Sequence, residues 1–454
     1  MNAKKRFLSL LLAIVTLLTL LPTVALAETA AEKAIVLTST SHKLGGIDEW
    51  EVNRAYDQVY YGQANGSPIL WNVLDDQTNQ GELGMLMHAA QPLAQVSYDA
   101  GVQSWQSSSL RSWCLDFAGQ SGSAVADAFT AKELAAIMAV SMDDPAYTST
   151  SGSVAFAAAK NNLNADKVFF LSAKEAEINA YGFTSDPARR ASVNGSYVGW
   201  WLRSNKADTT TGYVGSSGAI AASGSASFFY ARPAMNIARS SILFTAQAGA
   251  KADGNGFAAV ADASDDAIYT LTVLDSSRTF TAAANVSQLE PGQTLTVTYE
   301  NAAVGANEYV SVILADENDQ ALYYGRLKNV AAQSDASGSL DITIPESLPF
   351  GSYKLCVFNE QYNGGTMTDY ASALSAIALT VDDVQEPLLE LGSGQFRTDE
   401  GATAVMRFIS SEAGTYYYKV MEKGQLPASH EELMAASPGE PCAAGETAFV
   451  VTGL

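Results

Sequence analysis

The residue types best suited to hold a ligand lie on one aromatic strand, residues 200–204. Side chains alternate across a strand, so Trp201 and Arg203 share one face. Trp200 and Leu202 share the other face, which we assign to the core. Trp201 would then offer a flat apolar surface beside the Arg203 guanidinium. Such a pair can stack a sugar ring or a peptide aromatic ring and hold a carboxylate.

A structural interpretation of the same strand stays open and is favoured. Arg203 and Arg232 would each neutralise a buried carboxylate, such as Asp166 or Glu175, and both tryptophans of the strand would be core residues. Under this interpretation, the face that carries Trp201 is closed to ligands.

A Gly/Ser/Ala-rich segment, residues 212–225, follows this strand. Its small side chains would either leave the neighbouring surface open to a ligand or form a hairpin with flexible turns, and the sequence favours neither. The candidate ligand-binding residues are Trp201, Arg203, Tyr213 and Arg232.

Recognisable catalytic motifs are missing from the sequence. It contains no G-x-S-x-G, H-E-x-x-H, C-x-x-C or G-x-x-x-x-G-K-[ST] pattern. His42 and His88 are the first two histidines, and nothing beside them supports a Ser/His/Asp triad. Asp75-Asp76 and Asp143-Asp144 are adjacent in sequence and tend to point apart, which favours solvated loop charges over a glycosidase pair. We predict no enzyme activity and no catalytic residue.

Composition and charge exclude other classes of protein. With 26 Lys+Arg against 48 Asp+Glu, the net charge of −22 leaves no basic patch for nucleic acid. Three His and three Cys offer few ligands for zinc or iron. The acidic hairpin tip 316–319 could bind Ca²⁺ weakly, but it does not match an EF-hand loop and a solvated turn is favoured. We predict no metal site and no cofactor.

The N-terminus has the form of a secretory signal peptide. Lys4-Lys5-Arg6 precede an apolar run, residues 7–21, and Ala25-Leu26-Ala27 fits a cleavage site after residue 27. The alternative, a membrane anchor, needs about 20 apolar residues, and no later stretch of that kind follows. We expect residues 1–27 to be removed and the mature protein to be secreted or associated with the cell surface, with no transmembrane segment.

Cysteine usage indicates domains that are held by their cores. Cys114, Cys356 and Cys442 are separated by more than 80 residues each, whereas disulfide-dependent secreted domains are cysteine-dense. We predict no intrachain disulfides.

The first large region, residues 35–245, mixes helix and strand signals. Serines 107–109 precede an apolar i, i+3, i+7 stripe, and residues 130–133 and 172–175 have the form of capping boxes. Short strands are indicated at residues 69–74, 168–171, 200–203 and 228–230. Two or three helices among separated strands predict an α+β domain.

Six short motifs occur in order across this region. They are Tyr61-Gly62; Pro68-Ile69-x-Trp71-x-Val73-Leu74; Trp105-x-x-Ser108-Ser109-Leu110-Arg111-Ser112-Trp113; Val168-Phe169-Phe170-Leu171-Ser172-x-x-Glu175-Ala176; Trp200-Trp201-Leu202-Arg203-Ser204; and Ala231-Arg232-Pro233-Ala234. With them, the region resembles the domain of unknown function 6273, found in exported proteins of Firmicutes. The structural signature residues are Trp71, Trp105, Leu110, Arg111, Trp113, Trp200 and Pro233.

This resemblance implies a C-type-lectin-like fold, which is also seen in formylglycine-generating enzymes and in retroelement-diversified binding proteins. It places ligand-contacting loops near residues 212–225, although that segment is poorer in Asn than is usual in the family. Cys114 stands where the family usually has Leu, and Ala231 replaces the usual Val. Formylglycine-generating chemistry uses a pair of cysteines, so the single Cys114 implies that this activity is absent.

The rest of the chain indicates β-sandwiches. Residues 246–266 are small, acidic and aperiodic, which predicts a linker. Short alternating strands over residues 267–382 predict an immunoglobulin-like sandwich. Residues 386–454 resemble a fibronectin-III-like sandwich, and because a Thr-Gly-Leu run usually precedes the last two strands of that fold, we expect this sandwich to be truncated.

These observations favour an exported, non-catalytic binding protein of a Gram-positive bacterium, in which a C-type-lectin-like domain recognises a glycan or protein ligand and β-sandwiches act as spacers. One alternative is a structural envelope protein. A second alternative is a cell-wall hydrolase, which would need His88 or two carboxylates to converge in a cleft.

Overall fold

The computed structural model describes residues 33–37, 56–75, 78–79, 82–99, 101, 104–119, 128–158, 161–252, 254, 256–382, 388–394, 396–397, 403–421, 432, 434–435 and 439–452. The chain divides into two compact units, residues 1–381 and residues 382–454. The predicted signal peptide, His42 and Asp76 lie outside the described residues.

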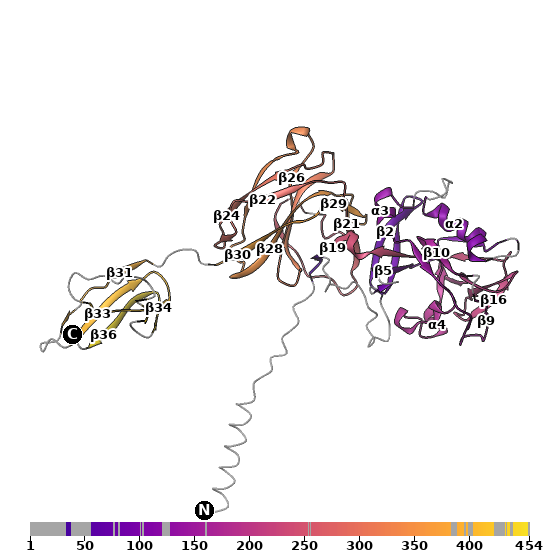
Figure 1. The fold of residues 1–454 in the computed structure, drawn as a ribbon, viewed down its shortest axis with the longest axis horizontal. Helices are drawn as coiled ribbons and strands as arrows, with labels where there is room; N and C mark the ends of the chain where they lie inside the picture. The colour runs from indigo at the N-terminus through magenta and orange to yellow at the C-terminus, as the bar shows by residue number, and fades with distance from the viewer. Residues whose placement is uncertain are drawn as a thin grey trace, which may run out of the picture. The chain divides into compact units, whose positions relative to one another are not determined.

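A large mixed sheet runs through the first unit (Figure 1). Its main path, in order of pairing, is β11 (Val168–Phe169), β18 (Ala234–Ala238), β5 (Glu82–Ala89), β3 (Ser67–Asp75), β2 (Gln58–Ala64), β21 (Ile268–Leu274), β29 (Asp369–Ala371), β28 (Gly351–Gln361), β25 (Glu308–Ala315), β26 (Ala321–Asn329) and β20 (Ala258–Ala259). Because β2 pairs in parallel with β21, the sheet of the first region continues into that of the second.

Other short strands extend this sheet on its sides. They are β1 (Ile35–Leu37), which pairs with β19 (Ile242–Gln247); β23 (Gln288–Leu289), which pairs with β30 (Ser375–Val381); and β4 (Thr78–Asn79), which pairs with β5. Strand β19 also pairs with β21, and β30 also pairs with β28. Val36 of β1 forms a further bridge to Gln320, next to β26. The start and the end of the first unit, β1 and β30, therefore both lie on the sandwich part of the sheet.

A second sheet of the first region carries the aromatic strand. Its order is β16 (Ile220–Gly224), β15 (Thr210–Val214), β14 (Trp200–Ala207), β17 (Phe228–Ala231) and β6 (Ala94–Ser97). Two-stranded ladders join β7 (Val140–Met142) with β10 (Leu163–Asp166), β8 (Tyr147–Thr148) with β9 (Ala155–Phe156), and β12 (Ala191–Val193) with β13 (Ser196–Val198). Every residue of β14 from Trp200 to Asn205 is buried, so both faces of this strand are covered.

The two main helices begin where the sequence predicts. Helix α2 (Ser109–Phe117) is capped by Ser108, whose Oγ accepts from the Arg111 N–H at 3.1 Å. Helix α3 (Ala131–Ala136) begins with the reciprocal capping box of Thr130 and Glu133. The remaining helical turns are η1 (Trp105–Ser107), η2 (Glu175–Glu177), η3 (Asn179–Tyr181), α4 (Asp186–Arg189), η4 (Arg239–Ser241) and η5 (Gln333–Asp335).

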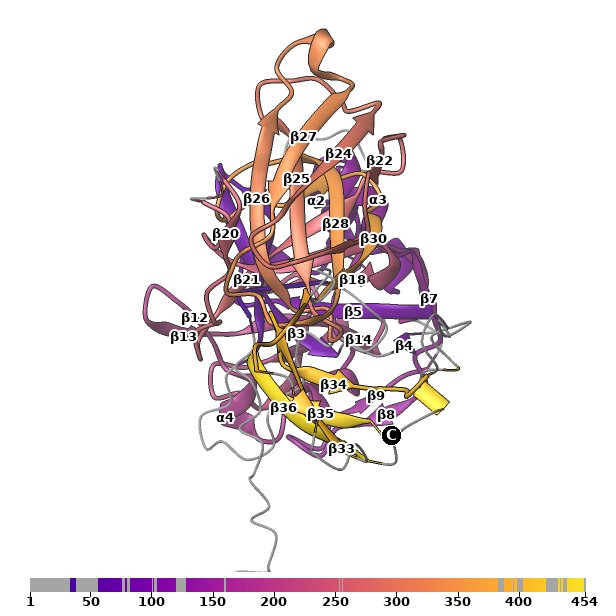
Figure 2. The same ribbon diagram turned by 90° about the vertical axis from the view of Figure 1, so that its left-hand side faces the viewer.

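The predicted sandwich is present in the second region. A three-stranded sheet of β22 (Thr281–Ala284), β24 (Thr294–Glu300) and β27 (Gly338–Thr343) packs against the long strands of the main sheet, as Figure 2 shows. The alternating residues face each other in a dry core that includes Leu295, Val297, Ile342, Leu355 and Val357. Burial of each such side chain contributes about 1.5–3 kcal/mol.

Parts of residues 246–266, which were predicted to be a linker, are packed into the fold. The first residues of this segment belong to β19, and β20 within it pairs with β26. Lys251 is buried, and Arg326 donates to the Lys251 carbonyl at 2.6 Å. Small residues are typical of linkers, but here they allow neighbouring segments to pack closely. A Cβ on Gly254, for example, would lie 2.7 Å from the Tyr324 ring.

The second unit is a β-structure as well. Its strands are β31 (Leu389–Leu391), β33 (Thr403–Ser410), β32 (Phe396–Arg397) and β36 (Gly445–Thr452) in one sheet, with β34 (Gly414–Tyr416) and β35 (Glu440–Cys442) in a separate ladder. Leu389 and Leu391 of β31 are exposed, so this unit covers its apolar side chains less completely than the first.

All three cysteines lie among the described residues, and each is a free thiol. Cys114 and Cys356 are buried, and burial raises the pKa of both thiols. In the part of the chain that the structure describes, no helix has the length and apolar character needed to span a bilayer.

Candidate functional site

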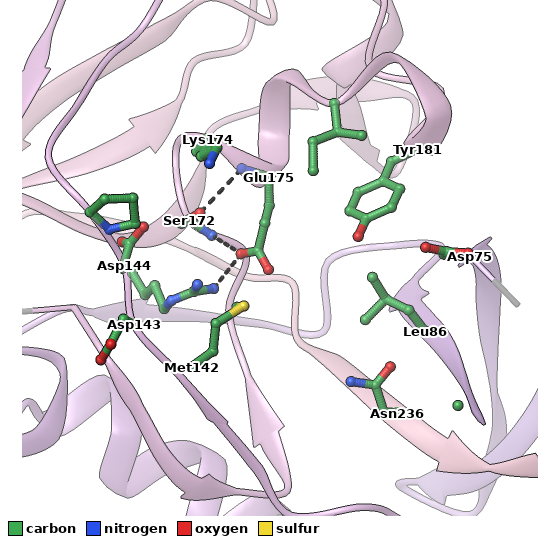
Figure 3. Close-up of a pocket in the computed structure, with 14 residues that line it drawn as sticks. Asp75, Leu86, Met142, Asp143, Asp144, Ser172, Lys174, Glu175, Tyr181 and Asn236 are labelled. Carbon is green, nitrogen blue, oxygen red and sulfur yellow. Dashed lines mark hydrogen bonds and ion pairs between the residues drawn. The ribbon is translucent and has the colours of Figure 1, made fainter. Parts of the chain in front are cut away.

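A pocket of about 210 Å³ lies where β5, β7, β14 and β18 meet the turns η2 and η3 (Figure 3). It is lined by Asp75, Gly84, Leu86, Met142, Asp143, Asp144, Pro145, Ser172, Lys174, Glu175, Ile178, Tyr181, Arg203 and Asn236. We call it the acidic pocket, because its lining contains four carboxylates but only one lysine and one arginine.

Glu175 is fixed at the pocket wall by the turn that precedes η2. The Ser172 N–H donates to Glu175 Oε2 at 2.7 Å, and the Glu175 N–H donates to Ser172 Oγ at 3.1 Å. This is the capping box that the sequence predicts, but it is followed by 3₁₀ turns rather than a long helix, because Ile178 is extended. The box therefore serves to position a carboxylate.

Arg203 reaches the same carboxylate from β14. Its Nη1 forms an ion pair with Glu175 Oε2 and donates to the Phe170 carbonyl at 2.8 Å, while its Nε donates to the Asn161 carbonyl at 3.1 Å. The Arg203 side chain is 1% exposed. Arg203 is thus a buried partner of Glu175, as the structural interpretation predicts, and at the same time part of the pocket wall.

Asp144 is a buried carboxyl that its surroundings keep partly protonated near neutral pH. Burial raises its pKa to about 6; Arg203 opposes this rise, and Glu175 adds to it. Its Oδ2 accepts from Ser204 Oγ at 3.2 Å. The adjacent Asp143 is exposed and accepts from Asn162 Nδ2 at 2.8 Å, so the two acids use different partners.

Asn236 is an unsatisfied polar group in this wall. It belongs to the otherwise apolar strand β18 and is 0% exposed, and neither its Oδ1 nor its Nδ2 has a hydrogen-bond partner among the described residues. In Figure 3, Asn236 and Tyr181 lie on either side of Leu86. A buried unpaired amide costs about 1–3 kcal/mol. A polar ligand that offered both a donor and an acceptor there would remove this cost.

Tyr181 and Lys174 provide donors on the side opposite Asn236. Burial raises the pKa of Tyr181, and the negative charges of Glu175 and Asp75 raise it further. The Tyr181 hydroxyl therefore stays protonated and can donate. Lys174 is exposed beside Glu175. The pocket thus combines donors and acceptors around an excess of negative charge.

The structure places the other candidate residues away from this pocket. Trp201 is 0% exposed, and its Nε1 donates to the Val96 carbonyl at 2.9 Å. Tyr213 is half-buried and stacks on Phe229, with ring centroids 4.0 Å apart. The interpretation of Trp201 as a ligand surface is therefore wrong, because neighbouring aromatic rings cover that face of β14.

Arg232 is also buried, but its partners differ from those expected. Its Nε donates to the Ala89 carbonyl at 2.9 Å, and its guanidinium lies 5.2 Å from the centre of the Trp200 ring. The carboxylate of Asp166, suggested as a partner, instead pairs with Arg111 at 2.6 Å. Arg232 therefore acts in the core through carbonyl groups and a ring face.

His88 does not offer a reactive imidazole. It is completely buried, and its Nε2 lies 3.2 Å from the Arg232 carbonyl. Burial lowers its pKa, and the positive charge of Arg232 lowers it further, so the ring is neutral. Of the carboxyl groups, Asp144 and Glu175 both line the acidic pocket.

The signature residues of the six motifs hold the core together. Trp71 Nε1 donates to the Tyr61 carbonyl at 2.8 Å, and Trp200 Nε1 donates to the Arg189 carbonyl at 3.0 Å. Trp113 stacks on Phe117 with ring centroids 5.0 Å apart. The remaining signature residues Trp105, Leu110 and Pro233 are buried.

The acidic hairpin tip uses its carboxylates internally. Asp316 Oδ1 accepts from the Asn318 and Gln320 N–H groups at 2.8 and 3.0 Å, and Asp319 pairs with Lys354. Across the described ranges, no group of three or more His, Cys, Asp or Glu side chains is arranged to hold a metal ion.

Two pocket residues were missed from the sequence. Asn236 could have been noticed as a single amide within the apolar run Ala234-Met235-Asn236-Ile237, where a buried polar side chain needs a partner. Tyr181 gives no such signal, because only the turn of η3 directs it toward the pocket.

Part of the first region is similar to a known family. Residues 85–239 match the model of a family described as a domain of unknown function, DUF6273. This span contains the acidic pocket except for Asp75 and Gly84. The predicted resemblance to this family is confirmed over that span.

Other comparisons add little. No curated protein matches the chain. Two solved structures are similar at 10% identity and a TM-score of 0.17: native E. coli alpha-2-macroglobulin, where the match covers 52% of this chain and 19% of that one, and Salmonella alpha-2-macroglobulin reacted with methylamine, where it covers 88% and 29%. The chain thus spans less than a third of either protein, and so low a TM-score supports no statement about fold or function.

Proposed function

We propose that residues 56–245 form an exported, non-catalytic binding domain whose acidic pocket receives an amine-bearing group of an extracellular glycan or peptide. The observation that carries this proposal is the fully buried amide of Asn236, which lines the pocket without a hydrogen-bond partner. Native proteins leave few buried polar groups unpaired, and a ligand that completes the hydrogen bonds is a direct explanation.

The charge of the pocket supports an amine as the recognised group. Its lining holds four carboxylates against one lysine and one arginine, and Arg203 is paired with Glu175. Low-dielectric walls lined by one sign of charge concentrate ions of the opposite sign. A primary ammonium also supplies three donors, which suit carboxylate and amide oxygens.

The setting of this domain is part of the same proposal. The basic and apolar N-terminus supports secretion, and the six motifs together with the DUF6273 match support a C-type-lectin-like arrangement on the surface of a Gram-positive cell. The sandwiches of residues 267–382 and 386–454 would act as spacers.

The test compares two pairs of probes with the mature full-length chain by isothermal titration calorimetry. Glucosamine and alanine amide carry a primary ammonium, whereas N-acetylglucosamine and N-acetylalanine amide are their neutral counterparts. We expect at least one amine to bind about tenfold more tightly than its neutral counterpart, and we expect Asn236→Leu to remove the difference. Equal affinity within both pairs, or an unchanged preference in Asn236→Leu, would contradict the proposal.

A second candidate function, a cell-wall hydrolase, is favoured by one observation. Asp144 has a pKa of about 6, whereas Glu175 is paired with Arg203, so two carboxyls in one pocket have environments that suit a general acid and an ionised partner. Release of soluble fragments from purified peptidoglycan, abolished in Asp144→Asn, would favour the hydrolase over the binding domain. If no soluble fragments are released and the amines bind, the hydrolase is excluded.

A further inference from the structure

A second polar cluster lies in the sandwich part of the first unit and is almost fully buried. Lys251 is 3% exposed, and Glu360 and Asp369 are each 0% exposed. Lys251 Nζ contacts Asp369 Oδ2 directly and lies 2.8 Å from Glu360 Oε1. We call these three residues the lysine triad.

The remaining polar atoms of the triad are held by fixed donors. Glu360 Oε2 accepts from Ser311 Oγ at 2.7 Å and from Tyr324 Oη at 2.6 Å. Asp369 Oδ1 accepts from the Asn363 N–H at 2.5 Å. These contacts leave Oε1 of the glutamate and Oδ2 of the aspartate facing the amine.

The surroundings of the amine are largely aromatic. Lys251 Nζ lies 5.0 Å from the centre of the Phe244 ring and 5.7 Å from that of Tyr362, with Thr272 Oγ1 at 3.0 Å. Two carboxylates face the ammonium here, and the positive charge of Arg326 also acts on Glu360. Burial raises the pKa of Asp369 to about 6, whereas the two carboxylates raise the pKa of Lys251, so the charged ammonium is the resting form. Transfer of a proton from the ammonium to Asp369 must therefore precede any attack by the amine.

An arginine cluster nearby shows what distinguishes the triad. Arg278 pairs with Asp275 at 3.0 Å and with Glu308 at 2.6 Å, and the half-exposed Lys132 also pairs with Asp275 at 2.7 Å. A guanidinium keeps its proton and is not a nucleophile, whereas a buried lysine can lose its proton and attack a carbonyl carbon. Of the buried cations in the two clusters, Arg278 and Lys251, it is Lys251 that can act as a nucleophile.

We propose that Lys251 and Asp369 form a covalent amide cross-link, in which Lys251 Nζ bonds to Asp369 Cγ and one water molecule leaves. The neutral amine attacks the carbon of the protonated carboxyl group. Asp369 Oδ1 carries the developing negative charge, which the Asn363 N–H already faces and can stabilise. Asp369 Oδ2 is the oxygen that leaves.

Glu360 carries the protons in this reaction. Its Oε1 takes a proton from the attacking nitrogen and delivers it to the departing Oδ2, so the glutamate ends as it began. The condensation needs no oxidant, reductant or activating group, because the carboxyl oxygen leaves as water. The carboxyl group needs no chemical activation because the reacting groups are held in contact and away from solvent.

The test is mass spectrometry of the denatured mature chain. We expect a mass lower by one water than the sequence requires, and after proteolysis a branched peptide that joins the segments around Lys251 and Asp369, 118 residues apart. The full mass that the sequence requires, with both linear peptides recovered, would overturn the proposal. This experiment needs no variant.

Three variants sharpen the assignment. Lys251→Arg keeps the positive charge but removes the nucleophile, and Glu360→Gln keeps the shape but removes the proton carrier, so both should show the full mass of their own sequences. Glu308→Gln alters the arginine cluster instead and should retain the loss of water. Loss of water in Lys251→Arg, or branched peptides that exclude Asp369, would contradict the assignment.

Discussion

The acidic pocket and the lysine triad are both buried polar sites of one compact unit, yet they satisfy their polar atoms in opposite ways. In the triad, each carboxylate oxygen faces an amine, a hydroxyl or a backbone N–H. In the pocket, the amide of Asn236 has no partner in the described structure. Under our proposals, the triad is complete within the chain, whereas a ligand completes the pocket.

Two buried asparagines express the same contrast. Asn359 is 0% exposed and bonds to Arg278, Glu308, Ala303 and Tyr309. Asn236 is equally buried and makes no such bonds. Burial alone therefore does not distinguish the two asparagines; their hydrogen-bond partners do.

The largest expected effect follows from removal of the cation of the triad. Lys251→Met removes the proposed cross-link and leaves Glu360 and Asp369 buried without their ammonium partner, and we expect a loss of at least about 3–5 kcal/mol in the free energy of unfolding. Urea denaturation measures it. Lys174→Met, at the exposed rim of the pocket, is the matched control and should change stability by less than about 0.5 kcal/mol. Similar losses of stability in Lys251→Met and Lys174→Met would contradict the contrast between the triad and the pocket.

The asparagine pair gives the next largest effect. Asn359→Leu leaves the buried hydrogen-bond partners of Asn359 unpaired, and it should lower the free energy of unfolding by about 2 kcal/mol. Asn236→Leu removes an unpaired amide and should leave the unliganded protein as stable as before or slightly more stable. Both are measured by the same denaturation experiment. If Asn236→Leu were as destabilising as Asn359→Leu, the amide would have a structural partner after all.

The same Asn236→Leu variant should weaken binding of the amine probe about tenfold, close to 1.4 kcal/mol, because one hydrogen-bonding group is lost from the pocket. Calorimetric titration with glucosamine or alanine amide measures this effect. Tyr213→Phe, in the stacked pair away from the pocket, should bind as the natural chain does. An equal loss in Tyr213→Phe would point to a different ligand surface.

The pH dependence of stability tests the environment of Asp144. Its pKa rises from 3.8 to about 6 on folding, chiefly because the carboxyl is buried. The folded state thus favours the protonated form, and this contribution to stability is present below 3.8 and is lost as the pH rises through about 6. Asp144→Asn should flatten that part of the profile. Amine binding should strengthen over the same interval, and an unchanged profile in Asp144→Asn would contradict the assignment.

The smallest effect concerns Lys174. Lys174→Gln removes a positive charge from the rim of the acidic pocket, and we expect amine affinity to rise about twofold at low ionic strength and the gain to shrink with added salt. Titrations at two salt concentrations measure it. Weaker binding in Lys174→Gln would mean that the recognised group is an anion.

Local chemistry could be predicted from the sequence, but long-range partnership could not. The caps at Ser108 and Thr130 and the alternation of Leu295 and Val297 depend on neighbours a few residues away, and the structure confirms them. The burial of Trp201 depends on aromatic rings brought in from other strands. That information is not contained in the residues around it.

The lysine triad is a stronger case of the same limit. Lys251 lies in a segment whose composition is typical of a linker, and its partners follow more than a hundred residues later. In the acidic pocket, Glu175 was considered as a partner for Arg203, and Asp143 and Asp144 as loop charges. Their convergence required the fold of β7, η2 and β14 around one space.

The pairing of β1 with β19, and its bridge to Gln320, has a mechanical consequence. Among the described strands of the first unit, β1 is the first and β30 the last, and both belong to the sandwich part of the sheet. A force applied between these two strands would therefore pass through the sandwich and bypass residues 85–239.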